Sequence, residues 1–147
     1  MARRFLIILI ALVALTLPLA AQQGGIYSGD AGLDSSLKSL NVQASTDVGS
    51  FTAQLSAEFG VKQVQLQTWM KAERLQPAEI YLLLELSRIA RKPPAAVLQL
   101  YKNNKGKGWG AVIRALGIKP GSPEFKALKG SAAEHNQKLK AKAKKKK

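Results

Sequence analysis

Apolar residues recur at helical spacing along most of this chain, and nowhere do apolar and polar residues alternate for long enough to form a sheet. Phe51, Leu55 and Phe59 follow one another at intervals of four residues, which places them in one stripe on a helix. The segment 77–91 opens with Pro77 and is apolar over most of its circumference, as expected of the most buried helix in a bundle. The pattern predicts an all-α fold.

Proline and glycine residues divide the pattern into short helices. Asp47 suits an N-cap and Gly60 a C-terminal stop, which brackets a first helix over 48–59. We expect the following helices at 61–74, 77–91, 94–103 and 109–116, and a last one that ends near Lys129. In the helix over 61–74, the expected buried residues are Val61, Val64, Leu66, Trp69 and Met70. The sequence thus predicts a compact bundle of about five to six short helices over residues 47–130.

Residues 1–21 have the pattern of a signal peptide. Arg3 and Arg4 precede an uncharged apolar run over 5–17, and Pro18 is followed by small residues that suit a signal peptidase. An uncleaved membrane anchor is the alternative. A spanning helix needs about 20 apolar residues, and Pro18 interrupts the run, which favours cleavage. We expect a bacterial protein of the periplasm or the medium.

Residues 22–46 are polar and rich in Gly, Ser and Ala, so we expect a flexible linker between the leader and the domain. Leu33, Leu37 and Leu40 have helical spacing within this stretch. They leave open a short amphipathic helix near 32–40.

Positive charge is concentrated at the C-terminal end. The chain carries 23 Lys and Arg against nine Asp and Glu, a net charge of +14. Residues 131–147 contain seven Lys against Glu134 alone, with too few apolar residues to predict a folded segment. We expect a disordered lysine-rich tail here. His135, the only histidine, falls in this tail and is expected to be solvated.

The composition argues against most catalytic and metal-binding chemistry. The chain has no cysteine and no histidine in the predicted domain, which removes thiolate nucleophiles, most nucleophile–base pairs and the usual metal ligands. Glu85 follows three leucines and shares a helix face with Tyr81 and Arg88. It suits either a carboxylate held for acid–base work or an ion pair on a helix, and the ion pair is favoured. We predict no enzyme activity, no cofactor and no metal site.

The segment 102–110 is the candidate binding site. Its lysines surround glycines that would let the backbone approach a ligand, and it leads into a helix N-terminus that favours an anion. The spacing is not that of a P-loop. In the alternative interpretation the glycines serve only the turn and the tryptophan is part of the core. The candidate anion-binding residues are Lys102, Lys105, Gly106, Lys107, Gly108 and Trp109.

The run from Tyr101 to Lys129 contains three short motifs in sequence, KGKGWG, LGIKPGS and EFKALK. In these motifs the chain resembles a family of small exported bacterial proteins of uncharacterised function. The resemblance covers about 29 residues, with a weaker similarity back to about Phe51. It implies export and one shared domain, and it brings no activity, ligand or catalytic residue.

A basic exported protein meets anionic lipid, lipopolysaccharide or nucleic acid. We therefore expect a non-enzymatic binder of anionic surfaces or polymers. Contact with a membrane would come through an uncleaved leader or through peripheral binding. A protein–protein adaptor in an envelope assembly is the alternative, and it would use an apolar groove between helices to hold a protein partner.

Overall fold

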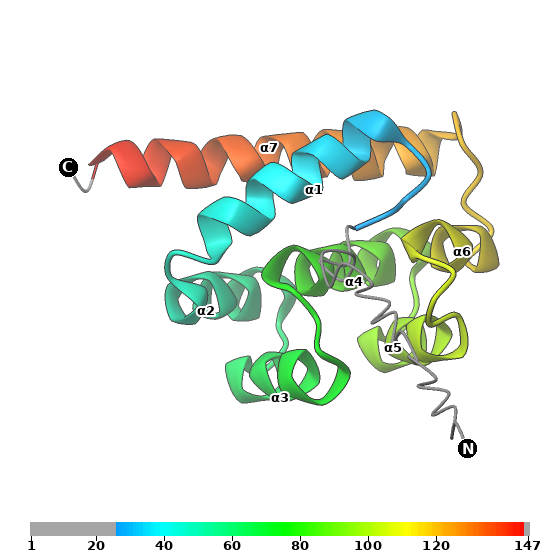
Figure 1. The fold of residues 1–147 in the computed structure, drawn as a ribbon, viewed down its shortest axis with the longest axis horizontal. Coiled ribbons are helices and arrows are strands. Elements are labelled where there is room, and N and C mark those ends of the chain that lie inside the picture. Colours follow the sequence, from blue (N-terminus) through cyan, green and yellow to red (C-terminus); the bar gives the residue numbers. More distant parts are fainter. Residues whose placement is uncertain (1–25, 146–147) are drawn as a thin grey trace, which may run out of the picture.

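The computed structural model describes residues 26–145 of the chain, and Figure 1 shows their arrangement. Within that range it contains helices and no strand, which confirms the predicted all-α fold. The predicted signal peptide lies outside the described residues. The helices are α1 (Ala31–Ala44), α2 (Val48–Phe59), α3 (Gln63–Glu73), α4 (Pro77–Ala90), α5 (Pro94–Asn103), α6 (Trp109–Ala115) and α7 (Pro123–Lys145).

Local sequence signals set the ends of these helices. The side chain of Asp47 accepts a hydrogen bond of 2.9 Å from the backbone N–H of Ser50, as expected of the N-cap of α2. Gly60 ends α2 in the left-handed conformation, with φ at 68°. Pro77 and Pro94 occupy the first positions of α4 and α5, where a missing N–H costs nothing.

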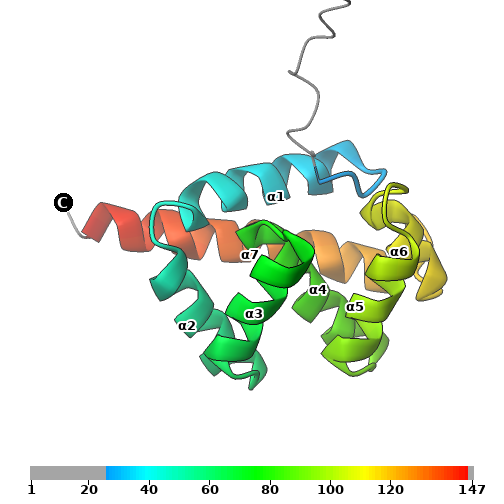
Figure 2. The same ribbon diagram turned by 60° about the horizontal axis from the view of Figure 1, so that its bottom comes forward.

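The central helix is α4. Its residues from Pro77 to Ser87 are all buried, and α1, α2, α3, α5 and α7 pack against it. Both ribbon views show α4 surrounded by the other helices (Figures 1 and 2). This confirms the prediction that the segment 77–91 is the most buried helix.

The N-terminal part of the domain begins earlier than predicted. Residues 31–44 form α1 in place of the predicted flexible linker over 22–46, and Leu33, Leu37 and Leu40 are completely buried. The helix near 32–40 is therefore present and longer than the leucine spacing suggested. Its narrow apolar stripe packs on α4 and α7, and burial of these leucines stabilises a helix whose other faces are polar.

The C-terminal prediction was also wrong. The last helix does not end near Lys129, because α7 continues through the predicted disordered tail to Lys145. Figure 1 shows α7 lying alongside α1 for most of its length. Ala132, His135 and Asn136 are buried, so His135 is not solvated. These residues and the partly buried Leu139 recur on one face of the helix. This face packs on the domain, although the composition of the segment predicted no folded structure.

Helix α3 is the least embedded of the helices. Only Leu66 is buried, Trp69 and Met70 are partly buried, and Val64 is 73% exposed. The prediction that Val64 faces the core is therefore wrong. None of the described helices has the length and apolar content that a membrane span requires.

Candidate functional site

Trp109, at the start of α6, belongs to the core. It is 1% exposed, and its indole Nε1 donates a 2.9 Å hydrogen bond to Oε1 of Glu79. Its ring stacks on Tyr101, with the two ring centroids 4.8 Å apart. Trp109 was among the candidate anion-binding residues, but its ring is buried against Tyr101, so the alternative interpretation, that it is part of the core, holds.

Gly108, just before α6, and Gly110, in its first turn, make room for the segment that precedes α1. A Cβ atom on Gly110 would lie 2.7 Å from the carbonyl oxygen of Ser28, and one on Gly108 would lie 3.0 Å from that of Tyr27. Gly106 and Gly108 also have positive φ values, of 87° and 74°. The N–H of Gly110 donates to the carbonyl oxygen of Tyr27 at 3.0 Å. The carbonyl oxygen of Tyr27 thus accepts from an N–H group at the N-terminus of α6, where the sequence predicted an anion.

The lysines of this turn are exposed, as expected, but two of them are already paired. The Nζ atoms of Lys102 and Lys105 lie 3.3 and 3.1 Å from the carboxylate of Glu73 on α3. These hydrogen bonds hold the pKa of the Glu73 carboxyl below its usual value. Lys107 forms no ion pair with any other described residue. One carboxylate offsets only one of the two ammonium charges paired with it, so the turn keeps positive charge, but Lys102 and Lys105 are directed to Glu73 and Lys107 is not.

A denser cluster of positive charge lies on the final turns of α7. We call residues 138–145 the lysine end of α7. Its five lysines are all exposed: Lys138, Lys140, Lys142, Lys144 and Lys145. Lys138 pairs with Glu134 at 2.8 Å, and no acidic residue follows Glu134 in the chain. Figures 1 and 2 both show this end of α7 projecting past the other helices.

A groove between α1 and the lysine end of α7 has a volume of about 610 Å³. Lys38 of α1 lines one side, and Lys140 and Lys144 of α7 line the other. Val42, which is 65% exposed, and Ala143 give the groove an apolar component. The groove combines three ammonium groups with apolar surface, and no acidic residue lines it.

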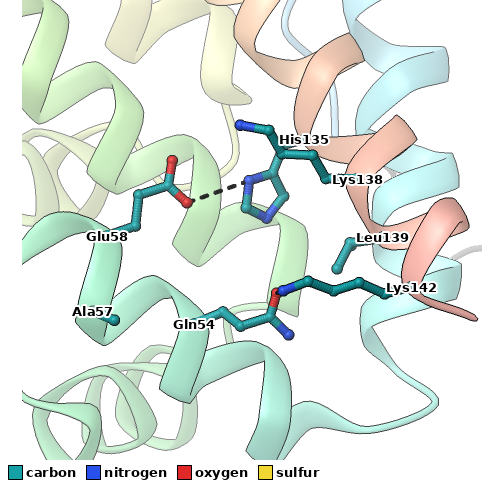
Figure 3. A pocket seen from close by; sticks show the side chains of 7 residues that line it. All are labelled: Gln54, Ala57, Glu58, His135, Lys138, Leu139 and Lys142. Carbon is teal, nitrogen blue, oxygen red and sulfur yellow. Dashed lines mark hydrogen bonds and ion pairs between the residues drawn. The ribbon is translucent and has the colours of Figure 1, made fainter. Parts of the chain in front are cut away.

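A second pocket lies between α2 and α7 and has a volume of about 410 Å³. Figure 3 shows the side chains that line it: Gln54, Ala57, Glu58, His135, Lys138, Leu139 and Lys142. The residues of each helix recur at intervals of three and four, so each helix contributes one face. Sequence reasoning missed this pocket because His135 was assigned to a disordered tail. The helical spacing of residues 135, 138, 139 and 142 is the signal that was available.

His135 is packed between aromatic rings beneath this pocket. It is 6% exposed, with ring centroids 5.9 Å from that of Phe51 and 4.7 Å from that of Tyr81. Its Nδ1 lies 3.6 Å from a carboxylate oxygen of Glu58, and its buried Nε2 has no hydrogen-bond partner within the described residues. Burial lowers the pKa of His135 below its usual value, and the charge of Glu58 opposes this shift.

Glu85 on α4 is buried, at 2% exposure, and forms an ion pair with Arg88 one turn later. The guanidinium Nε donates to Oε2 of Glu85 at 3.1 Å. Burial raises the pKa of the Tyr81 phenol, and the nearby charge of Glu85 adds to this shift. This geometry is the ion pair on a helix that the sequence favoured, with the Glu85 carboxylate buried and the Arg88 side chain exposed.

The chain matches no known family model, no curated protein and no solved structure in comparisons with all three. Among residues 26–145, no three His, Cys, Asp or Glu side chains lie close enough together to hold a metal ion. Its function must therefore be inferred from the charge, burial and contacts of its own residues.

Proposed function

We propose that this protein is an exported, non-enzymatic binder of anionic surfaces or polymers, and that the lysine end of α7 makes the contact. The observation that carries the proposal is the set of five exposed lysines on the last turns of α7, with no acidic residue after Glu134. Lysines that displace counterions from a polyanion bind it with a strong dependence on salt and with little sequence preference.

The helical state of this segment supports the proposal. A helix fixes the spacing of its lysines, so less conformational entropy is lost on binding than for a disordered tail. Lys38 of α1 lies across the groove from Lys140 and Lys144 and enlarges the positive surface. The binding surface is thus built by two helices that are far apart in sequence.

The turn before α6 has a smaller role in this proposal than the sequence suggested. Glu73 pairs with both Lys102 and Lys105 and offsets one of their two charges. Gly108 and Gly110 make room for the backbone of Tyr27 and Ser28. Lys107 remains as a minor contact. The predicted signal peptide over 1–21 and the resemblance to small exported bacterial proteins support the exported location.

The proposal is tested with the purified chain from Gln22 to Lys147. Its binding is measured on vesicles that contain phosphatidylglycerol, on lipopolysaccharide and on DNA, at low and at physiological salt. In the test variant the five lysines of residues 138–145 become glutamine. In a charge-matched control five exposed lysines elsewhere become glutamine: Lys62, Lys71, Lys92, Lys119 and Lys126.

We expect the α7 variant to lose about tenfold or more in affinity at low salt. Each lysine–phosphate contact releases counterions and so contributes to the salt-dependent part of the binding free energy. The control should lose much less. Equal losses in the two variants would show that affinity follows net charge alone and would refute the role of α7.

A protein–protein adaptor is the second candidate, and one observation favours it. On helix α3 Val64 is 73% exposed, and Trp69 and Met70 are only partly buried, so the helix leaves apolar side chains uncovered. An adaptor would bind one protein from envelope extracts at high salt, and Val64→Asp would abolish capture. Binding that disappears as salt rises argues for the polyanion proposal instead.

A further inference from the structure

The pocket between α2 and α7 has a polar atom at its floor that the protein does not satisfy. Its other lining residues are exposed or partly buried, whereas His135 is 6% exposed. Nε2 of His135 is buried and lacks a hydrogen-bond partner in the described part of the chain. Such atoms are rare in folded proteins, and one beside a pocket points to a partner that the chain does not supply.

The other ring nitrogen decides what that partner can be. Nδ1 faces the Glu58 carboxylate at 3.6 Å, which favours a proton on Nδ1. When the ring is protonated, Nε2 carries a second hydrogen and becomes a donor without an acceptor. Figure 3 shows Nε2 on the side of the ring toward Gln54 and Lys142. A ligand there meets a charged N–H group.

Lys142 supplies a second positive group at the same place. Its Nζ donates to the neutral amide oxygen of Gln54 at 2.9 Å, so its charge is not cancelled by a carboxylate. Lys138 also lines the pocket, although it shares its charge with Glu134. The pocket is also lined by the Glu58 carboxylate, which faces Nδ1. A protonated imidazole and two ammonium groups outnumber this carboxylate and supply charged donors for an oxyanion.

We propose that this pocket binds one phosphate group of an anionic lipid, held by Nε2–H of His135 and by the ammonium groups of Lys142 and Lys138. The inference rests on the proposed function, because it names the chemical group that the lysine end of α7 recognises. A lipid source is favoured over nucleic acid because the pocket itself is lined by apolar Ala57 and Leu139 beside its lysines, and this suits acyl chains near a headgroup.

Binding at this pocket is coupled to proton uptake. The charged and titratable groups that face the imidazole are Glu58 from α2, Tyr81 and Glu85 from α4, and Lys138 and Lys142 from α7. Glu85 is already paired with Arg88. Burial disfavours the imidazolium, and a bound oxyanion favours it. The affinity for the anion therefore rises as the pH falls through the pKa of His135.

Nuclear magnetic resonance gives a direct test, because His135 is the only histidine and its ring signal needs no assignment. The probe is inorganic sulfate, which stays fully ionised across about pH 5 to 8, where a histidine titrates. Sodium chloride at equal ionic strength is the control. We expect sulfate to raise the measured pKa of His135 and chloride to leave it unchanged. A pKa that sulfate does not move would overturn the proposal.

Two variants separate this site from general charge. Lys142→Gln should weaken sulfate binding about threefold to tenfold, as expected for loss of one charge-assisted contact. Lys126→Gln removes the same charge from the same helix, outside this pocket and outside the lysine end of α7, and should have little effect. Equal effects of the two variants would refute the pocket as the site.

His135→Phe keeps an aromatic ring between Phe51 and Tyr81 and removes both nitrogens. It should weaken binding to phosphatidylglycerol vesicles at about pH 5.5 and leave binding to DNA unchanged. A loss on DNA alone would overturn the lipid assignment. If vesicle binding is unchanged in His135→Phe but lost in the variant with five glutamines, the pocket proposal fails and the proposed function stands. If the wild type binds sulfate but binds neither vesicles, lipopolysaccharide nor DNA, the proposed function fails.

Discussion

The indole Nε1 of Trp109 donates a 2.9 Å hydrogen bond to Oε1 of Glu79, and both side chains are buried. Oε2 of Glu79 accepts a 2.7 Å hydrogen bond from the backbone N–H of Gln76, in a capping box at the start of α4. One carboxylate thus joins the first turn of α6 to the first turn of the central helix. This connection holds the turn before α6 in place and gives Trp109 a structural role in the core.

Trp109→Phe should lower the free energy of unfolding by about 1–3 kcal/mol, because it leaves a buried carboxylate oxygen without its donor. Trp69→Phe is the matched control, since the indole of Trp69 makes no hydrogen bond within the described residues and its ring is only partly buried. Urea denaturation at neutral pH measures both. A loss in Trp109→Phe no larger than in Trp69→Phe would contradict the structural role of the Glu79 contact.

Gly110→Ala should destabilise the protein by about 1–3 kcal/mol through overpacking, because the new Cβ would lie 2.7 Å from the backbone oxygen of Ser28. Gly130→Ala, inside α7, meets no atom within 4 Å and should stabilise the protein by about 0.5–1 kcal/mol. Thermal unfolding of the two variants checks the opposite signs. A neutral Gly110→Ala would show that the segment 26–30 does not pack against α6.

Leu37→Ala should cost about 2–5 kcal/mol, because Leu37 is fully buried between α1 and the helices on which it packs. Val42→Ala removes apolar atoms from the exposed side of the same helix and should change stability by less than about 0.5 kcal/mol. Both values come from denaturant titration. Equal, small effects would indicate that residues 31–44 are the flexible linker that their composition suggests.

Stability should fall as the pH drops from about 7 to about 5, and His135 should be responsible for part of this fall. Burial places the pKa of His135 in the folded state below the usual 6.5. Below pH 6.5 the unfolded chain therefore binds more protons than the folded protein, and protonation favours unfolding. Carboxyl groups with lowered pKa, such as that of Asp30, lose their contribution only at lower pH.

His135→Phe provides the comparison for this pH dependence, because it removes the titrating group and keeps a ring between Phe51 and Tyr81. Its free energy of unfolding should decrease less than that of the wild type between about pH 7 and pH 5. Urea denaturation at several pH values measures the difference. Parallel pH profiles for the two proteins would show that His135 is solvated in the folded state.

The sequence predicted the helices best where the signals that start or end a helix are local. The ends of α2, α4 and α5 follow from Asp47, Gly60 and the two prolines, since a cap or a proline acts on the adjacent turn whatever surrounds it. The burial of α4 follows from its apolar circumference. The candidate site was harder to predict, because the roles of Lys102 and Lys105 depend on Glu73, which lies on another helix.

The sequence by itself determined that this protein is all-α, where its central helices begin and end, and that its C-terminal segment is strongly basic. These properties depend on periodicity, caps and composition, which act within a few residues. Only the tertiary structure decided that residues 31–44 and 131–145 are ordered helices, and that His135 lies buried beneath a pocket. Neither helix has enough apolar surface to predict its order from composition. Each is stabilised by packing on the other and on α4, from positions almost 100 residues apart in the chain.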